Sequence, residues 1–172
     1  MPLRTRYKTD IDTAAAKWGL DPLLVEAVVV RESGGNTDAF RFEPDFWNRY
    51  LKTNPKYRGL NPRRVSSSYG LMLVMYGRIL GDTIADPSAW EPELLFIPEN
   101  GLGIGCKLLA QLMQWAEALP ATPGATSTEK ALAAYTGGKG GNDGRTLPLR
   151  NGKYARDVLS ILSILTKEYE SK

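Results

Sequence analysis

The stretch Asp21-Pro-Leu-Leu-Val-Glu-Ala-Val-Val-Val-Arg-Glu-Ser-Gly-Gly35 is the clearest structural signal in the chain. Asp21 is a typical N-cap residue, and Pro22 is favoured in a first helical turn. Two glycines follow Ser33 and would end a helix there. Three consecutive valines would also suit a buried strand, but the caps and the length favour a helix from Leu23 to Ser33.

Glu32 continues the apolar stripe of this predicted helix. It follows Val29, Val28 and Val25 at three, four and seven residues, which are helical spacings. A charged carboxylate on a core-facing stripe is costly, so burial would raise the pKa of Glu32 and suit it to general-acid chemistry. The alternative is a structural glutamate paired with Arg31 or another arginine at the rim of the core.

Helical periodicity also dominates the rest of the chain, and no convincing alternating strand is found. The predicted helices are 10–18, 66–80, 101–119, 128–135 and 154–169. Residues 36–65 are expected to form a long loop or irregular turns, 86–98 a connection with a turn at 92–95, and 137–141 a flexible loop. Gly101, Gly103 and Gly105 are interpreted as small residues that permit close helix packing. The sequence predicts a single all-α domain over residues 1–172.

The composition excludes several classes of enzyme. The 172 residues include no histidine and one cysteine, Cys106. A Ser/His/Asp triad, a Cys/His dyad, a histidine-ligated metal and an internal disulfide are therefore impossible. We expect no metal and no cofactor. No apolar run approaches about twenty residues, so no membrane span is predicted, and the basic N-terminus lacks the apolar core of a signal peptide.

A basic, aromatic segment at about 40–64 interrupts the helical pattern. Between residues 41 and 64, seven basic residues stand against two acidic ones, whereas 65–102 holds five acidic residues and one arginine. Aromatic rings interleaved with arginines could form a sugar-binding wall, or the aromatics could cover the core from a solvated loop. Single-stranded nucleic-acid binders show the same mixture, but no nucleic-acid motif is present, so we expect no such partner.

Four motifs occur in a fixed order and together resemble a known family. They are Val30-Arg-Glu-Ser-Gly-Gly-Asn36, Ser68-Tyr-Gly-Leu-Met72, Ala131-Leu-Ala-Ala-Tyr-Thr-Gly-Gly138, and Tyr154 with Val158. The chain resembles the lytic transglycosylase domain of the soluble lytic transglycosylase type, which is related in fold to goose-type lysozyme. The resemblance covers residues 10–165 and implies a compact, lysozyme-like helical domain with a substrate groove and a basic aromatic insertion at 40–64.

The resemblance implies an enzyme in which Glu32 is the single catalytic residue. Glu32 would protonate the glycosidic oxygen between N-acetylmuramic acid and N-acetylglucosamine in peptidoglycan. It would then act as a base on the C6 hydroxyl of the same sugar, which closes a 1,6-anhydro ring without water.

The resemblance also implies six substrate-binding residues: Ser68, Met72, Leu73, Tyr135, Thr136 and Tyr154. Ser66 or Ser67 could be the equivalent serine in place of Ser68. Tyr135 matches the tyrosine that orients the glutamate. Two positions depart from the family's pattern, because Leu73 replaces a glutamine and Thr136 replaces an asparagine. Two polar contacts to substrate are thus expected to be missing.

Two alternatives follow from the same residues. A muramidase would hydrolyse the same bond with water and a second carboxylate, about 6.5–9.5 Å from the first in an inverting enzyme; the candidates are Asp38, Glu43, Asp45 and Asp143. A weakly active or inactive wall-binding module, for example of a virion, is the other alternative. In each case we expect a monomer whose partner is the glycan strands of peptidoglycan. The expected location is the bacterial cell wall (periplasm or extracellular). A phage-encoded protein would fit the missing signal peptide.

Overall fold

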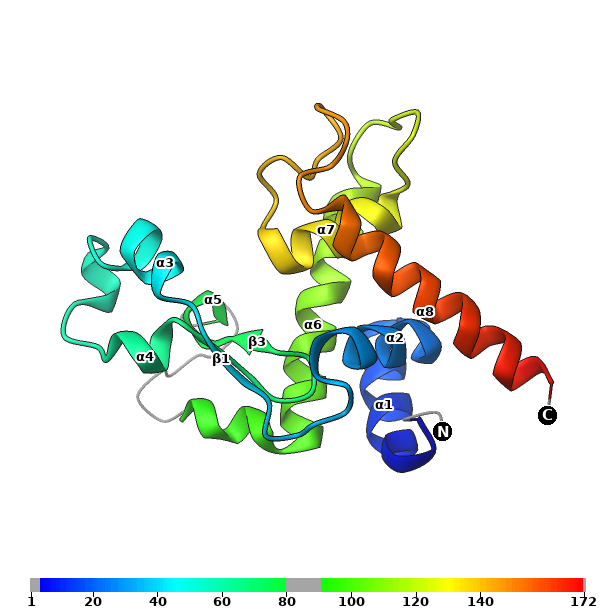
Figure 1. Cartoon of the computed structure of the whole chain (residues 1–172), viewed down its shortest axis with the longest axis horizontal. Helices are drawn as coiled ribbons and strands as arrows, with labels where there is room; N and C mark the ends of the chain where they lie inside the picture. The colour runs from blue at the N-terminus through cyan, green and yellow to red at the C-terminus, as the bar shows by residue number, and fades with distance from the viewer. Residues whose placement is uncertain (1–3, 80–90, 172) are drawn as a thin grey trace. The chain divides into compact units, whose positions relative to one another are not determined.

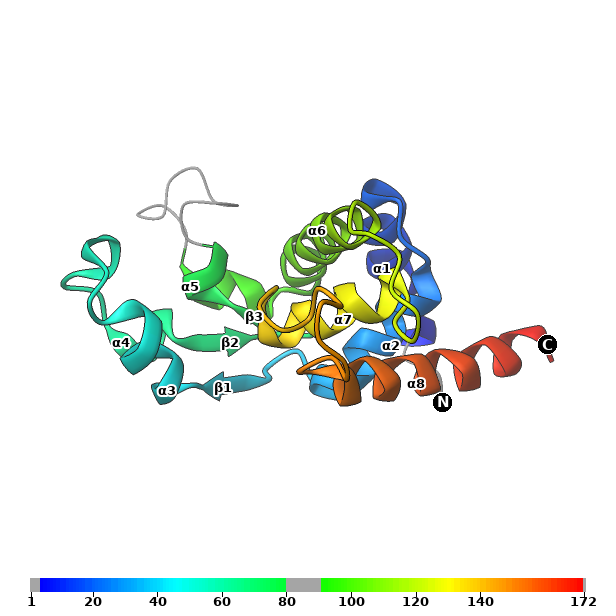
Figure 2. The same cartoon turned by 90° about the horizontal axis from the view of Figure 1, so that it is seen from above.

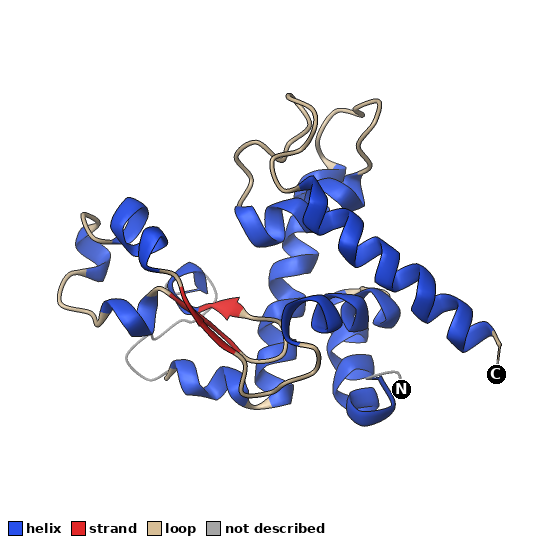
Figure 3. Ribbon diagram, in the orientation of Figure 1, coloured by secondary structure: helices blue, strands red, loops and turns tan. Residues whose placement is uncertain are grey.

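The computed structural model describes residues 4–79 and 91–171, with side chains from Arg6 onward. These residues are mostly helical, and a small sheet is the exception, as Figure 3 shows. The fold class predicted from the sequence is therefore confirmed. The chain divides into two compact units: the first is Met1–Arg31 with Cys106–Lys172, and the second is Glu32–Gly105.

The five long helices end within two residues of the positions that the sequence predicted, and three of them also begin there. They are α1 (Arg4–Trp18), α2 (Pro22–Ser33), α6 (Pro98–Glu117), α7 (Ser127–Gly137) and α8 (Gly152–Glu170), shown in Figure 1. The helix predicted at 10–18 starts six residues earlier, and α6 starts three residues earlier than expected. The periodic apolar stripes and the caps account for this agreement.

The first unit is built around α7 and α8, which pack against each other in Figure 1. Thr126 and Glu129 form a reciprocal capping box at the start of α7. One turn further on, the buried Lys130 donates from Nζ to the carbonyl of Pro120 (3.1 Å) and to the Thr122 hydroxyl (2.9 Å). The helix thereby fixes the segment that precedes it.

The second unit contains a three-stranded antiparallel sheet, and the helix predicted at 66–80 is wrong. The strands are β1 (Phe40–Phe42), β2 (Ser67–Tyr69) and β3 (Val74–Met75), which lie side by side in Figure 2. The short helix α5 (Tyr76–Ile79) follows β3, and residue 80 lies outside the described part. The run from Tyr69 to Met75 is largely buried. A buried strand and a buried helix are both apolar throughout, so the composition of this run does not distinguish them.

The turn between β2 and β3 shows why these residues cannot be helical. Gly70 (φ 74°) and Leu73 (φ 42°) both have positive φ, and the N–H of Leu73 donates to the carbonyl of Gly70 at 3.0 Å. A Cβ on Gly70 would lie 2.1 Å from the carbonyl oxygen of Leu95, so only glycine fits. Gly101 approaches the same oxygen from α6, where a Cβ would lie at 2.5 Å. The predicted close packing holds at Gly101 and at Gly105, which faces Met72, but Gly103 has open space around it.

The predicted loop at 36–65 holds one strand and several short helical turns. After β1 come α3 (Pro44–Phe46), a π-helical turn η1 (Trp47–Leu51), a 3-10 turn η2 (Pro55–Tyr57) and α4 (Pro62–Val65). Residues 44–65 form an excursion that leaves the sheet after Glu43 and returns to it at Ser66. Two hydrogen bonds close its base: the Glu43 N–H donates to the Ser66 carbonyl (2.8 Å), and the Ser66 hydroxyl donates to the Glu43 carbonyl (2.6 Å). Another 3-10 turn, η3 (Pro92–Phe96), lies in the predicted connection, of which residues 86–90 fall outside the described part.

Opposite charges that are separated in the sequence meet in the second unit. Arg64, at the end of the basic segment, binds Glu93 with two hydrogen bonds (2.7 and 2.9 Å) and also binds Glu91. Tyr69 donates its hydroxyl to the Arg64 carbonyl, and burial raises the pKa of this tyrosine above its ordinary value. Part of the positive charge at 41–64 is therefore neutralised within the fold.

Candidate active site

Glu32 lies in the last turn of α2, and its side chain is only 5% exposed. The helix ends immediately after it, because Gly34 (φ 60°) adopts the left-handed conformation. The hydroxyl of Ser33 donates to the carbonyl of Leu71 (2.7 Å) and accepts from the N–H of Gly35 (3.2 Å). The backbone beside Glu32 is thus tied to the turn that connects β2 and β3.

A single guanidinium group joins Glu32 to a second carboxylate. Arg41 places Nη1 at 4.0 Å from Oε2 of Glu32, and its Nε and Nη2 each lie 3.1 Å from Oε1 of Glu43. The Ser68 hydroxyl donates to the same Glu43 oxygen at 3.4 Å. Arg41 lies in β1, Glu43 follows the end of this strand two residues later, and Ser68 is the cross-strand neighbour of Arg41. The alternation of side chains along a strand brings the three to the same face.

Among the three serines left open by the sequence, the structure gives only Ser68 a bond to this charged cluster. The hydroxyls of Ser66 and Ser67 donate to the backbone carbonyls of Glu43 and Arg63. Both of those side chains are fully buried, and Ser68 is nearly so. Ser68 is therefore the one of the three whose hydroxyl contacts a charged side chain of the cluster, and its contact with substrate stays a prediction.

The sequence left Arg31 or another arginine as the ion-pair partner of Glu32, and in the structure Arg41 is the arginine within 4.0 Å of it. Arg31 lies in the other unit, where its Nε donates to Asp157 at 3.2 Å and its guanidinium stacks over the Tyr154 ring. Hydrogen bonds from Lys153, reinforced by those from Arg31, hold the pKa of Asp157 below its ordinary value. Arg31, on α2, therefore contacts two residues of α8, Tyr154 and Asp157.

The remaining substrate-binding residues predicted from the sequence differ in accessibility. Tyr135 on α7 and Tyr154 on α8 are almost wholly buried, whereas Thr136 is exposed. These three residues belong to the unit that holds Cys106–Lys172, and their contacts with substrate stay a prediction. Leu73 is partly exposed in its left-handed turn conformation.

Met72 does not present a surface to a ligand in this structure. Its side chain is fully buried, and it packs against Gly105, where a Cβ would lie 2.4 Å from the methionine sulfur. The side chain of Met72 fills the space that Gly105 leaves open. Its contact with substrate stays a prediction.

Of the four candidates for a second carboxylate, Glu43 is the one that contacts Arg41, the arginine next to Glu32, among the described contacts. Asp38 and Asp45 are exposed, and Asp143 pairs with Arg145 at 3.4 Å in the other unit. Sequence reasoning missed the bridging role of Arg41. The one available signal was the alternation of apolar and charged residues from Phe40 to Glu43, which is the period of a strand.

The aromatic residues of the 40–64 segment divide between buried and exposed positions. Tyr57 is buried and donates its hydroxyl to the carbonyl of Gly77 at 2.9 Å, so it covers the core. Phe40 and Tyr50 are exposed, and Arg63 lies over the rings of both Phe40 and Phe42. Binding of sugar by the exposed rings stays a prediction.

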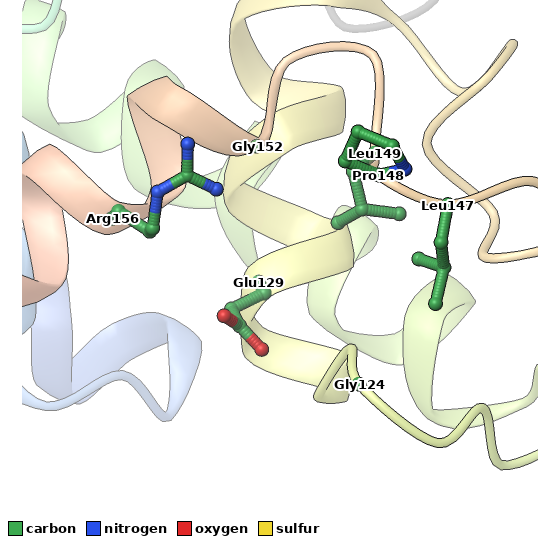
Figure 4. Close-up of a pocket in the computed structure, with 7 residues that line it drawn as sticks. All are labelled: Gly124, Glu129, Leu147, Pro148, Leu149, Gly152 and Arg156. Carbon is green, nitrogen blue, oxygen red and sulfur yellow. The ribbon is translucent and has the colours of Figure 1, made fainter.

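A pocket of about 340 Å³ lies within the first unit, at the starts of α7 and α8 (Figure 4). Glu129 and Arg156 are its charged lining residues, and Leu147, Pro148 and Leu149 make one wall. The Glu129 carboxylate is engaged in the helix cap with Thr126. The pocket therefore offers little that points to a reaction.

Other kinds of site are not found among the described residues. No group of three or more acidic or cysteine side chains could hold a metal ion in the described part of the chain. Over the same ranges, no helix has the length and apolarity that a membrane crossing requires. Burial raises the pKa of the Cys106 thiol to about 12, so this side chain is unreactive near neutral pH.

Comparisons with known proteins agree with the fold and with the motifs. The Transglycosylase SLT domain family matches residues 10–156. A solved structure of the lytic transglycosylase Slt from Pseudomonas aeruginosa, an inactive mutant with a glutamate-to-glutamine replacement, superposes with a TM-score of 0.60 at 19% identity. That match covers 98% of this chain and 26% of the solved chain, so the chain spans about a quarter of its length. A search of curated proteins finds no match.

The fold and the matched family define the class of this chain as a transglycosylase SLT domain. The chain belongs to the Transglycosylase SLT domain family, whose match covers 10–156 and so includes Glu32, Ser68 and Tyr154.

Proposed function

We propose that the chain cleaves the bond between N-acetylmuramic acid and N-acetylglucosamine by lytic transglycosylation, with Glu32 as its single acid and base. The observation that carries this proposal is the setting of Glu32, whose side chain is withdrawn from water at the end of α2, next to the half-exposed Arg41. A carboxyl group shielded from water is suited to hold and return a proton during bond cleavage.

In the proposed reaction, the Glu32 carboxyl group donates its proton to the glycosidic oxygen as the bond from that oxygen to C1 of the muramic acid breaks. Glu32 is then a carboxylate beside a positively charged, oxocarbenium-like sugar, and the Arg41 guanidinium favours this charged form. The carboxylate takes the proton of the C6 hydroxyl while the C6 oxygen bonds to C1. The 1,6-anhydro ring closes, no water is consumed, and Glu32 is protonated again.

The comparison supports a mechanism with one essential glutamate. The solved Pseudomonas aeruginosa protein is described as an inactive mutant, and its replacement is glutamate to glutamine. A variant that keeps the shape of the side chain but cannot transfer a proton would be inactive in such a mechanism. We propose accordingly that the chain acts on glycan strands of the bacterial cell wall, and that Ser68, Tyr135, Thr136 and Tyr154 contribute to binding them.

Hydrolysis by a muramidase mechanism is the second candidate, because Glu43 shares Arg41 with Glu32. A second carboxylate in this position could activate a water molecule. However, a hydrogen bond from Arg41 Nε, an ion-pair contact from Arg41 Nη2 and a hydrogen bond from Ser68 converge on one Glu43 oxygen, which lowers its availability as a base. We therefore favour the transglycosylase.

The test is mass spectrometry of the fragments released from purified peptidoglycan by the wild-type chain, by Glu32→Gln and by Glu43→Gln. We expect 1,6-anhydromuramic ends from the wild type and from Glu43→Gln, and no fragments from Glu32→Gln, with circular dichroism confirming that each variant is folded. Reducing ends that carry an added water, and that disappear in Glu43→Gln, would establish the muramidase instead. Binding of peptidoglycan without fragments would indicate a wall-binding module.

A further inference from the structure

Arg41 holds an unusual position, because it is bound to one carboxylate and only approaches another. Its Nε and Nη2 lie 3.1 Å from Glu43, whereas the 4.0 Å from Nη1 to Glu32 is longer than a hydrogen bond. A guanidinium group has five N–H donors, and Glu43 engages one side of the group. The side that carries Nη1 is turned toward Glu32, and 52% of the Arg41 side chain is exposed.

Glu43 keeps this guanidinium in place. The Glu43 carboxylate accepts from Arg41 and Ser68, and the Glu43 backbone is bound in both directions to Ser66. Arg41 itself sits on β1, paired across the strands with Ser68. The guanidinium is thus prearranged by residues of the sheet, and a ligand that binds it does not have to order a free side chain.

The charges of the cluster change when Glu32 takes up its catalytic proton. With both glutamates ionised, one arginine faces two carboxylates; with Glu32 protonated, the arginine is balanced by Glu43 alone. The Nη1 side of Arg41 then has a neutral neighbour. An anionic group of a substrate could bind there with charge-assisted hydrogen bonds, which carboxylates and guanidinium groups form in paired geometry.

We propose that Arg41 is a specificity-determining residue that binds a carboxylate of the glycan strand next to the bond that Glu32 cleaves. This inference rests on the proposed function, in which the substrate carries carboxylates either on the lactyl group of muramic acid or on its peptide stem. Both sources present the same chemistry to Arg41. Glu43 acts as the positioning residue, because its carboxylate holds the Arg41 guanidinium in place.

The experiment compares the rates at which three peptidoglycan strands are cleaved: strands without peptides and with free lactyl carboxylates, the same strands with these carboxylates amidated, and strands that carry peptide stems. The wild type, Arg41→Gln, Arg41→Lys and Arg63→Gln are tested. Arg63 is the matched control, because it is an arginine beside the same sheet, but it stacks on Phe40 and Phe42 instead of the acidic cluster. The ratio of two substrates for one variant does not depend on the amount of folded enzyme.

We expect kcat/KM of the wild type to be about tenfold or more higher on the free-carboxylate strand than on the amidated strand, the effect of one charge-assisted hydrogen bond. Arg41→Gln should bring this ratio close to one, Arg41→Lys should leave it in between, and Arg63→Gln should keep it. If the stem is the source, the stem-bearing strand is preferred over both peptide-free strands and Arg41→Gln removes that preference.

A wild type that cleaves charged and amidated strands at equal rates, with no preference for stems, would overturn the proposal, and so would Arg41→Gln with the wild-type ratio. If Arg41→Gln is inactive, binding of the same strands is measured instead, in the single variant Glu32→Gln and in the double variant Glu32→Gln/Arg41→Gln. Equal affinity of the single variant for charged and amidated strands would overturn the proposal. If the wild type cleaves none of the three strands, the proposed function fails, which is a different result.

Discussion

The glycines of α6 allow a quantitative test of the packing described above. A Cβ on Gly103 would have no atom within 4 Å, whereas a Cβ on Gly101 would lie 2.5 Å from the backbone oxygen of Leu95. Replacing a helical glycine with alanine gains about 1 kcal/mol of helix propensity. Gly103→Ala should therefore raise the free energy of unfolding by about 1 kcal/mol.

Gly101→Ala has the same gain but must displace the Leu95 carbonyl, which also contacts Gly70. Overpacking of this kind costs about 1–3 kcal/mol, and a backbone group between two glycines is expected at the upper end. The net loss is about 2 kcal/mol, so the two variants should differ by about 3 kcal/mol. For a chain of this length, 1 kcal/mol corresponds to about 3 °C in Tm, and the expected separation is about 9 °C.

Urea and thermal unfolding, followed by circular dichroism, measure both variants against the wild type. Gly103→Ala is the matched control, because the substitution is the same and the two positions lie two residues apart in one helix. Equal stability of the two alanine variants would refute the close approach of α6 to Leu95, and with it the explanation of the glycine pattern.

Two further predictions concern Leu73 and the thiol of Cys106. Leu73→Gln should raise the cleavage rate about two- to tenfold, the effect of one hydrogen bond to substrate; unchanged or lower activity in the fragment assay would count against a missing contact. Because Cys106 is buried and its pKa is raised to about 12, Ellman's reagent should modify it only after unfolding, and rapid modification of the native protein would contradict its burial. The unfolded thiol ionises from about pH 8.5, whereas the folded thiol stays protonated there. The contribution of Cys106 to the free energy of unfolding therefore falls as the pH rises above about 8.5. In Cys106→Ala, the free energy of unfolding should fall less steeply with rising pH than in the wild type.

The sequence predicted the parts of the fold that depend on local spacing. The α2 helix follows from Asp21, Pro22 and the glycines after Ser33, and the candidate acid Glu32 follows from the apolar stripe of the same helix. The helix and the burial of Glu32 need only the period of a helix and the chemistry of its ends, which are properties of neighbouring residues. The catalytic role of Glu32 is implied by the family resemblance and stays a prediction.

The β2–β3 hairpin could not be predicted in this way. Its residues are largely buried, so the run from Tyr69 to Met75 has no polar face and no readable period. The turn also requires Leu73 to adopt a positive φ, which is uncommon for a residue of this type. The pairing of Arg41 with Glu32 depends on a contact between a helix end and a strand, and no local pattern encodes such a contact.

The closed base of the 44–65 excursion has a consequence for how such domains diversify. Two hydrogen bonds between Glu43 and Ser66 join the strands at the point where the chain leaves the sheet and returns to it. We expect that the segment beyond this junction can change in length or sequence while Arg41, Glu43 and Ser68 keep their register. The excursion and the proposed site are in this sense separately adjustable, and the excursion is a natural position for grafting a different segment onto an unchanged sheet.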